Sequence, residues 1–381
     1  MKTEPAASQA TRVVHAAAGG PDALRAVSPP LYLSTTFERD EHYAFPGGFD
    51  YAREANPNRT MLEEALAQLE GGVEAAAFAS GMAAAMTLFQ ALQPGDRVVV
   101  AHDTYYGVRA MLNEVFVPWG LRVEYVDASD PHALAAALAR PARLIFVETP
   151  SNPMLRVTDL AAAARLAHDA GALLACDNTM ATPVFQQPLA LGADIVVHAT
   201  TKYLAGNHDA MGGALVTARA DAFWDGIRRR QKLCGAIPSP FASWLTLRGI
   251  STLVPRMRWH DATALAIAHA LAGDARVAEV LHPGLRSHPA HAVAARQSSG
   301  TGGVFSIRVA GGRDAALRVA SRLRLFRRAT SFGGAESLVE HRATVEGAGS
   351  PTPPDLLRLA IGLEAADDLI GDLDRALEPR R

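Results

Sequence analysis

The alternation of short apolar runs with alanine-rich stretches between residues 61 and 197 is the feature that most constrains the fold. Short apolar runs bounded by turn residues indicate buried strands, and longer periodic stretches indicate helices. Strands are expected at 75–79, 97–101, 122–126, 143–147, 173–176 and 194–197, and helices at 61–69, from 81 onward, at 132–139 and at 160–170. This order predicts an α/β fold with a mostly parallel sheet covered by helices on both faces.

The two ends of the chain do not show this alternation of apolar runs and alanine-rich stretches. Prolines interrupt any helical period in the first 60 residues, which indicates an irregular arm rather than a domain with its own core. Beyond about residue 244, helical stretches at 256–271, opened by Pro255, and at 314–323 flank a strand-like segment at 303–309. We therefore expect three parts: an N-terminal arm (1–60), a large domain (61–250) and a smaller α+β C-terminal domain (251–381).

Composition excludes several classes of protein. The formal net charge of −2 gives no reason to expect nucleic acid or an acidic membrane surface as a partner. The two cysteines, Cys176 and Cys234, form no CxxC pair, which argues against a metal site or a disulfide framework. The chain shows neither a secretory signal nor an apolar stretch of the roughly 18 residues that a membrane helix needs. We expect a soluble, cytoplasmic protein.

Polar residues follow the predicted strands. They stand at 80–82 (SGM), 103–107 (DTYYG), 148–153 (ETPSNP), 177–179 (DNT) and 198–202 (HATTK). Ligands of parallel sheets bind beyond the carboxyl ends of the strands, so these segments predict one shared site. The helix that begins after Ser80 offers free backbone N–H groups that suit a phosphate, although Ser-Gly is also an ordinary helix cap.

Two of these residues have specific chemistry. A carboxylate at Asp177 could pair with a protonated pyridine nitrogen, and its other interpretation is a helix cap or turn residue. Lys202 follows an apolar strand, where burial would lower its pKa and favour the free amine of Schiff-base chemistry. The alternative for Lys202 is a lysine that extends along a domain edge to reach solvent. The 25-residue separation of the two places them on neighbouring strand ends.

The chain resembles the Cys/Met-metabolism enzymes that use pyridoxal 5'-phosphate (PLP): cystathionine γ-synthase, cystathionine γ-lyase, cystathionine β-lyase and methionine γ-lyase. The resemblance runs from 11–16 (TRVVHA) to 367–370 (DDLI), and its most specific motifs are 148–153 (ETPSNP) and 201–204 (TKYL). It implies the fold type I of PLP-dependent transferases. It also implies PLP as cofactor and an amino acid as substrate.

The resemblance implies roles at the cofactor. Lys202 would carry PLP as a Schiff base and move protons, Asp177 would pair with the pyridine nitrogen, and Tyr105 would stack on the ring and help with proton transfer. Tyr106 follows directly, so either tyrosine could be the one that stacks on the cofactor. The spacing from Asp103 favours Tyr105. The remaining implied cofactor ligands are Asn152 near the phenolic oxygen, the backbone N–H groups of Gly81 and Met82 at the phosphate, and the hydroxyl of Thr201.

Other implied roles concern the substrate and the assembly. Arg358, in an apolar strand-like segment, would clamp the substrate α-carboxylate, with Ser331 and Asn152 beside it. Tyr51 and Arg53 match a motif that reaches the phosphate of the neighbouring subunit. The arm would then contact that subunit, and the protein would be a homotetramer built from dimers that share active sites.

Three positions depart from the family pattern. Ala199 stands where relatives usually have a phosphate-binding serine, with Thr200 next to it as a potential substitute. The segment 207–209 (NHD) replaces a more usual His-Ser-Asp. Thr330 replaces the glutamate of many γ-synthases and γ-lyases at a position facing the far end of the substrate, so the exact substrate stays open.

The expected reaction is γ-replacement or γ-elimination on a sulfur amino acid or an O-acylhomoserine. We favour a cystathionine γ-synthase-like enzyme, with cystathionine γ-lyase or methionine γ-lyase as the alternative. Phe332 stands where β-lyases often carry tryptophan, which argues mildly against that activity. A nicotinamide dehydrogenase is disfavoured because no GxGxxG follows a predicted strand. A non-catalytic PLP-fold binding protein is the alternative from another class.

Overall fold

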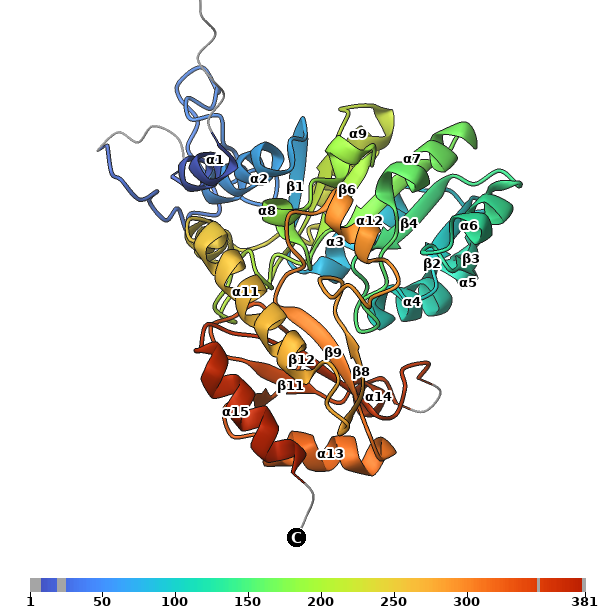
Figure 1. Cartoon of the computed structure of the whole chain (residues 1–381). Helices are drawn as coiled ribbons and strands as arrows, with labels where there is room; N and C mark the ends of the chain where they lie inside the picture. Colours follow the sequence, from blue (N-terminus) through green and yellow to red (C-terminus); the bar gives the residue numbers. More distant parts are fainter. Residues whose placement is uncertain (1–7, 19–24, 348–349, 379–381) are drawn as a thin grey trace, which may run out of the picture.

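The computed structural model describes residues 8–18, 25–347 and 350–378. In this part of the chain, seven strands form a large sheet and five strands form a smaller one (Figure 1). The predicted α/β class is confirmed.

The large sheet has the strand order β1-β7-β6-β5-β4-β2-β3. Its strands are β1 (Glu74–Phe78), β2 (Arg97–Ala101), β3 (Arg122–Val126), β4 (Leu144–Glu148), β5 (Leu173–Asp177), β6 (Ile195–His198) and β7 (Gly213–Thr217). Strands β2 to β6 pair in parallel, whereas β7 runs antiparallel to both β6 and β1. The predicted strands are confirmed to within a residue or two. Strand β7 was not predicted. No helix lies between β6 and β7, so β7 falls outside the alternation of strands and helices on which the prediction relied.

Helices cover both faces of this sheet. They are α2 (Pro57–Glu70), α3 (Gly81–Gln90), α4 (Tyr106–Met111), a π-helical turn (Leu112–Phe116), α5 (Val117–Trp119), α6 (Pro131–Leu138), α7 (Leu160–Asp169), α8 (Thr182–Phe185), a 3₁₀ turn (Pro188–Leu191), α9 (Ala222–Cys234) and α10 (Pro240–Ile250). Successive side chains of a strand point to opposite faces. Val98 and Val100 therefore pack into one core with Phe89 and Phe146, while Val99 enters the other, where Cys176 is also buried.

The small sheet has the strand order β10-β11-β12-β9-β8. From residue 253 onward the chain forms α11 (Leu253–Leu271), β8 (Val277–Leu281), α12 (His291–Gln297), β9 (Val304–Val309), α13 (Gly312–Arg322), β10 (Arg327–Arg328), β11 (Leu338–Glu340), α14 (Arg342–Glu346), β12 (Leu356–Ala360) and α15 (Ala366–Leu377). Helix α12 lies against the large-sheet part of the chain (Figure 1), where Arg296 pairs with Asp159. Figure 1 shows α13 and α15 on the side of the small sheet away from the large one. Helix α11 begins before Pro255, which occupies its first turn and so needs no partner for its missing N–H.

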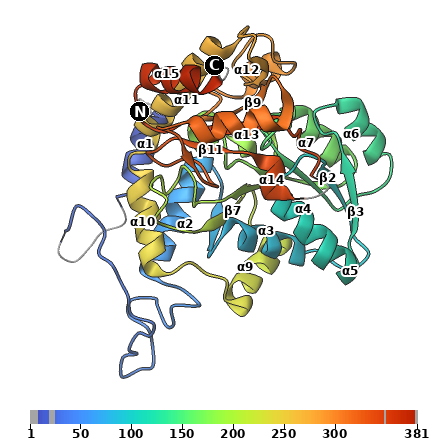
Figure 2. The same cartoon turned by 90° about the horizontal axis from the view of Figure 1, so that it is seen from below.

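The N-terminal segment is less irregular than predicted. Residues Gln9–Ala16 form helix α1, capped by the side chain of Ser8 and anchored by the buried Val13. Helix α2 begins at Pro57 rather than at residue 61, because the Asn56 side chain caps it and proline is well tolerated at the first helical position. The chain just before α2 extends away from both sheets, as Figure 2 shows.

Among the described residues, no helix is both long and apolar enough to cross a membrane.

Candidate active site

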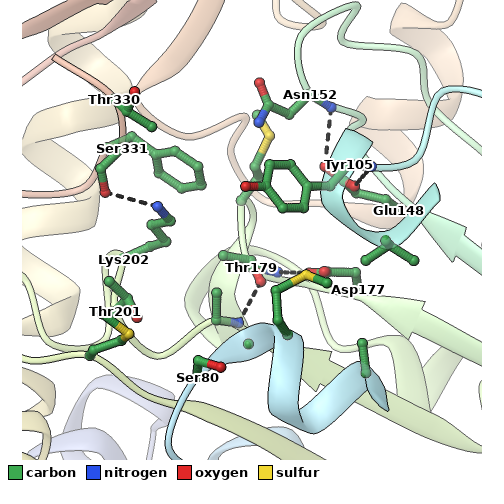
Figure 3. Close-up of a pocket in the computed structure, with 18 of the residues that line it drawn as sticks. Ser80, Tyr105, Glu148, Asn152, Asp177, Thr179, Thr201, Lys202, Thr330 and Ser331 are labelled. Atoms are coloured by element: carbon green, nitrogen blue, oxygen red, sulfur yellow. Dashed lines mark hydrogen bonds between the residues drawn. The ribbon is translucent and has the colours of Figure 1, made fainter. Parts of the chain in front are cut away.

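A cavity of about 210 Å³ lies at the carboxyl ends of the strands of the large sheet (Figure 3). The strand ends meet there because β1, β2, β4, β5 and β6 all run in the same sense. The small sheet supplies the opposite wall. The predicted site residues that line the cavity are Gly81, Met82, Tyr105, Asn152, Asp177, Thr201, Lys202, Ser331 and Arg358.

Tyr51 and Arg53 do not line this cavity in the described chain. Tyr51 is 45% exposed, and its ring faces the guanidinium of Arg53. Arg53 donates to the carbonyl oxygen of Lys232 and pairs with Glu54. Neither residue therefore contributes to the cavity of its own chain.

The start of α3 forms one wall of the cavity. The Ser80 hydroxyl accepts a hydrogen bond from the N–H of Ala83 at 3.0 Å. Within the described chain, no hydrogen bond engages the N–H groups of Gly81 and Met82, so these donors are free for a ligand. A side chain at Gly81 would bring its Cβ within 2.8 Å of the Ala199 Cβ, so only glycine lets the two backbones approach this closely.

Two carboxylates lie side by side at the ends of β4 and β5, where Glu148 and Asp177 pair in register. Burial raises the pKa of Glu148 well above its ordinary value, and the neighbouring Asp177 adds to the rise. Burial also raises the pKa of Asp177, although hydrogen bonds from Thr179 act against it. A cationic ring nitrogen placed beside these carboxyl groups would favour their charged forms and lower both pKa values.

Lys202 follows β6 and projects into the cavity. Its Nζ donates a hydrogen bond to the Ser331 hydroxyl at 2.8 Å and lies 5.1 Å from the centre of the Phe332 ring. Burial, with Arg358 nearby, lowers the pKa of Lys202 to about 8. About a tenth of the Lys202 side chains therefore carry a free amine at pH 7, far more than for an ordinary lysine, which suits a nucleophile toward an aldehyde.

Tyr105, rather than Tyr106, lines the cavity, and in Figure 3 its hydroxyl end points toward Lys202 and Ser331. A Cβ at Gly107 would lie 2.7 Å from the Tyr105 ring, so this glycine makes room for the ring. Burial, with Tyr106 adding to the effect, raises the pKa of Tyr105 to about 12. The phenol therefore stays protonated at neutral pH.

Arg358 extends from β12 into the cavity wall and is buried. Its Nη2 donates to the Ser331 carbonyl oxygen at 2.9 Å and pairs with Glu340 at 2.7 Å. Its Nη1 reaches the Asn152 side chain at 3.5 Å. Burial lowers the pKa of Arg358 to about 10, so the guanidinium stays charged at neutral pH.

Ala199, one of the positions that depart from the family pattern, and its neighbours Thr200 and Thr201 differ in their access to the cavity. Ala199 lines the cavity, whereas Thr200 is buried outside it and offers no hydroxyl there. The Thr179 hydroxyl accepts a hydrogen bond from the N–H of Ala199 at 2.8 Å. The Thr201 hydroxyl exchanges hydrogen bonds with the backbone of Gly212, which leaves it only partly available to a ligand.

The cavity fits PLP. The unengaged N–H groups at the start of α3 suit a phosphate, the carboxylates at β4 and β5 suit a protonated pyridine, and Lys202 suits the aldehyde. Tyr105 supplies an aromatic face from the same cavity.

Sequence reasoning assigned no role to three residues that shape this site. Glu148 accepts hydrogen bonds from the N–H groups of Tyr105, at 2.7 Å, and Asn152, at 3.1 Å, and so fixes both loops. Thr179 holds Asp177, and Arg342 lines the cavity next to Arg358. The position of Glu148 at a strand end was a usable signal. Arg342 gave none, because it comes from a distant part of the sequence.

Comparisons with known proteins identify the family of this chain. Residues 10–378 match the family of Cys/Met metabolism PLP-dependent enzymes. The chain is 45% identical to the cystathionine gamma-synthase of Mycobacterium tuberculosis, over 97% of this chain and 96% of that one. It is 40% identical to the cystathionine gamma-lyase of Mus musculus, over 93% and 91% of the two chains.

A solved structure is also similar. The cystathionine gamma synthase of Xanthomonas oryzae pv. oryzae in complex with cystathionine superimposes with a TM-score of 0.94 at 41% identity, covering 98% of both chains. A family match over nearly the whole chain, together with these relatives, establishes the affiliation that the cavity suggests. The chain belongs to the Cys/Met metabolism family of PLP-dependent enzymes.

Proposed function

We propose that this protein is a cystathionine γ-synthase that joins an O-acyl-L-homoserine to L-cysteine. In this reaction the bond from Cγ to the ester oxygen breaks and a bond from Cγ to the cysteine sulfur forms. The acyl group leaves as a carboxylic acid that takes the thiol proton. The proposal is supported by 45% identity to a cystathionine gamma-synthase along nearly the full chain.

The observation that carries the proposal is the meeting of Lys202 and Arg358 in one cavity, joined through Ser331. We infer that Arg358 holds the substrate α-carboxylate, with Asn152 and Ser331 beside it. A planar guanidinium offers paired donors that suit a carboxylate. The Cα of the bound amino acid would then lie beside the Lys202 amine.

PLP, when bound, stores the negative charge that develops on the substrate carbon atoms. We propose that Lys202 would hold the cofactor and then move protons at the substrate Cα and Cβ, with Tyr105 assisting. Asp177 would balance the charge of the pyridine nitrogen. The N–H groups of Gly81 and Met82 and the Thr201 hydroxyl would hold the phosphate, and Asn152 would lie near the phenolic oxygen.

We further propose a homotetramer of dimers in the cytoplasm. In this arrangement the N-terminal arm (1–60) reaches the neighbouring subunit, and Tyr51 and Arg53 approach its phosphate site. The exposure of Tyr51 and its absence from the lining of the cavity of its own chain support this role. We keep residues 61–250 and 251–381 as the two domains of each subunit.

The test combines spectroscopy with substrate trials. The purified protein should show the visible absorbance band of lysine-bound PLP, and borohydride should trap the cofactor on Lys202. O-acylhomoserine with cysteine should then yield cystathionine. A protein that instead only cleaves cystathionine or methionine to a 2-oxo acid would be a lyase. A protein that binds PLP and changes none of these compounds would be a binding protein.

A further inference from the structure

Glu70 is a buried carboxylate for which the reaction described above gives no role. It is the last residue of α2 and is 1% exposed. Its Oε1 lies 2.5 Å from the Nε2 of His198, the fully buried last residue of β6. Among the described residues that line the cavity at the strand ends, neither of these two is found. Burial of a carboxylate is costly unless hydrogen-bond donors replace the lost water.

Asn178 supplies a second donor to this carboxylate. Its Nδ2 donates a hydrogen bond to the same Glu70 oxygen at 2.8 Å. Asn178 directly follows Asp177, and its backbone N–H donates to the carbonyl oxygen of Val197 at 3.0 Å. One carboxylate therefore holds both the residue after Asp177 and the residue that ends β6.

These contacts lie on the face of the large sheet opposite to the Asp177 side chain. Asp177 and Val197 are paired in register on β5 and β6, and side chains alternate along a strand. Val197 packs in the core that contains Phe89, so the next side chain, His198, points to the other face, toward α2. Since Asp177 lines the cavity, Glu70 contacts its strand from behind.

A second set of contacts joins the same two strand ends from the cavity side, as Figure 3 shows. The N–H of Thr179 donates to the Asp177 carboxylate at 2.9 Å, and the Thr179 hydroxyl accepts from the N–H of Ala199 at 2.8 Å. Asn178 lies between Asp177 and Thr179 in the chain. With Asn178 held from behind, the Asp177 carboxylate has a fixed direction in the cavity.

The hydrogen bonds behind the sheet continue to β4. The Nδ2 of Asn178 also donates to the carbonyl oxygen of Gln186 at 2.9 Å, and its Oδ1 accepts from the Gln186 Nε2 at 3.0 Å. The same Nε2 donates to the carbonyl oxygen of Thr149, which follows Glu148, at 2.9 Å. Both hydrogens of the Asn178 amide are therefore engaged, one of them by Glu70.

His198 also favours the ionised form of Asp177. Burial raises the pKa of Asp177, whereas hydrogen bonds from Thr179 and the neighbouring His198 act against the rise. Within the described chain, Glu70 is the only hydrogen-bond partner of the His198 ring. Glu70 thus fixes the place of a group that helps to keep Asp177 charged.

We propose that Glu70 is a positioning residue that orients Asp177 toward the pyridine nitrogen of PLP, acting through Asn178 and His198. The inference rests on the role proposed above for Asp177 and adds a residue that touches neither cofactor nor substrate. A hydrogen bond weakens steeply when donor and acceptor are misaligned, so a small displacement of Asp177 would weaken its contact with the ring.

PLP titration of the cofactor-free protein, followed by visible absorbance, tests this role. Glu70→Ala should weaken PLP binding by roughly tenfold, the effect of one charge-assisted hydrogen bond. Glu70→Gln should keep most of the affinity, because its amide oxygen can accept the same two hydrogen bonds. In an Asp177→Asn background, Glu70→Ala should change the affinity by less than about twofold, because the two residues act through one contact.

Glu63→Ala is the matched control. Glu63 is a buried carboxylate two turns earlier in α2, where it accepts hydrogen bonds from the Ala77 N–H and the Gln231 side chain. It therefore ties α2 to β1 and α9 rather than to β5 and β6. Any loss of PLP affinity in Glu63→Ala should add in full to that of Asp177→Asn. Urea unfolding of the cofactor-free variants checks that each is folded.

Glu70→Met combined with His198→Leu covers the case in which Glu70→Ala does not fold, because replacing both partners by apolar side chains costs little stability. This double variant should lose PLP affinity in the same way. Wild-type affinity in these variants, or a loss that adds in full to that of Asp177→Asn, would overturn the role of Glu70 and leave that of Asp177 intact. Wild-type affinity in Asp177→Asn itself would refute the role of Asp177, and with it this inference.

Discussion

The Lys202 amine donates a hydrogen bond to the Ser331 hydroxyl, and this contact joins the edge of the large sheet to a loop of the small one. Ser331 has a φ of 102°, a backbone conformation that residues other than glycine rarely adopt. Beyond it, Gly333 packs so closely that a Cβ would lie 2.6 Å from the backbone nitrogen of Tyr203. The loop is therefore pressed against the lysine, and the two sheets define the site together.

Replacing Lys202 by alanine should abolish activity and the visible band of lysine-bound PLP. The side chain serves both as the attachment point and as the mobile base, so kcat should fall by roughly 10³-fold or more. Absorbance and steady-state assays on the purified variant provide the measurement. Lys202→Arg is the matched control, since it keeps the positive charge beside Ser331 but cannot bind an aldehyde. Substantial activity in either variant would contradict the assignment.

The lowered pKa of Lys202 predicts how PLP binding depends on pH. The free amine attacks the aldehyde, so the rate at which cofactor-free protein takes up PLP should rise with pH and level off above about 8. Below that value the ammonium form dominates and the rate should fall about tenfold per pH unit. Stopped-flow absorbance measures this profile. A rate that keeps rising to pH 10 would indicate an ordinary exposed lysine.

Ser331→Ala provides the control for that profile. The Ser331 oxygen accepts a hydrogen bond from the Lys202 ammonium and so stabilises the charged form. Its loss should move the midpoint of the uptake profile to lower pH. A shift in the opposite direction would mean that the contact is not made by the charged lysine.

Much of the large sheet could be predicted because its strands are short apolar runs separated by periodic helices. The polar residues after those runs, such as Asp177 and Lys202, fall together because parallel strands end at one edge. Helix α1 was not predicted, because the prolines elsewhere in the first 60 residues suggested an irregular segment. The local pattern that indicates the helix is short and begins at the N-cap Ser8. The capping of α2 by Asn56 was overlooked in the same way.

The wall formed by the small sheet was less predictable. Arg358 and Ser331 were found through the resemblance to a family and not through spacing. Glu340 contacts three residues of this wall: Thr330, Arg342 and Arg358. Its contact with Arg358 depends on the pairing of β11 with β12, which no local sequence pattern reveals. Charges that neutralise one another across a sheet become visible only when the fold is known.

The paired carboxylates at β4 and β5 should respond differently to neutralisation. Asp177→Asn removes the charge expected opposite the pyridine nitrogen, so PLP affinity and kcat should each fall by roughly tenfold to a hundredfold. The Glu148 carboxylate accepts hydrogen bonds from the N–H groups of Tyr105 and Asn152. In Glu148→Gln the side-chain NH₂ group would face one of these N–H groups, donor against donor, and that hydrogen bond would be lost. The substitution should therefore loosen the loops of Tyr105 and Asn152 and affect KM more than PLP affinity. Absorbance titration and steady-state kinetics separate the two patterns, and identical effects would contradict distinct roles.

Gly81→Ala should destabilise the protein and weaken PLP binding. The new Cβ would lie 2.8 Å from the Ala199 Cβ, so the start of α3 would have to move away, at a cost of about 1–3 kcal/mol. The same movement displaces the free N–H groups of Gly81 and Met82. Urea unfolding of the cofactor-free protein and PLP titration measure the two effects.

Two variants test whether this close approach is the cause. Adding Ala199→Gly to Gly81→Ala removes the nearest atom and leaves the Ala199 Cα at 3.1 Å, so part of the stability and PLP affinity should return. Gly371→Ala is the matched control, because Gly371 lies within α15 and a Cβ there would meet nothing within 4 Å. That change should be neutral or stabilise by up to about 1 kcal/mol through helix propensity. If Gly81→Ala proved as harmless as Gly371→Ala, the tight contact between α3 and Ala199 would not be what shapes this wall of the cavity.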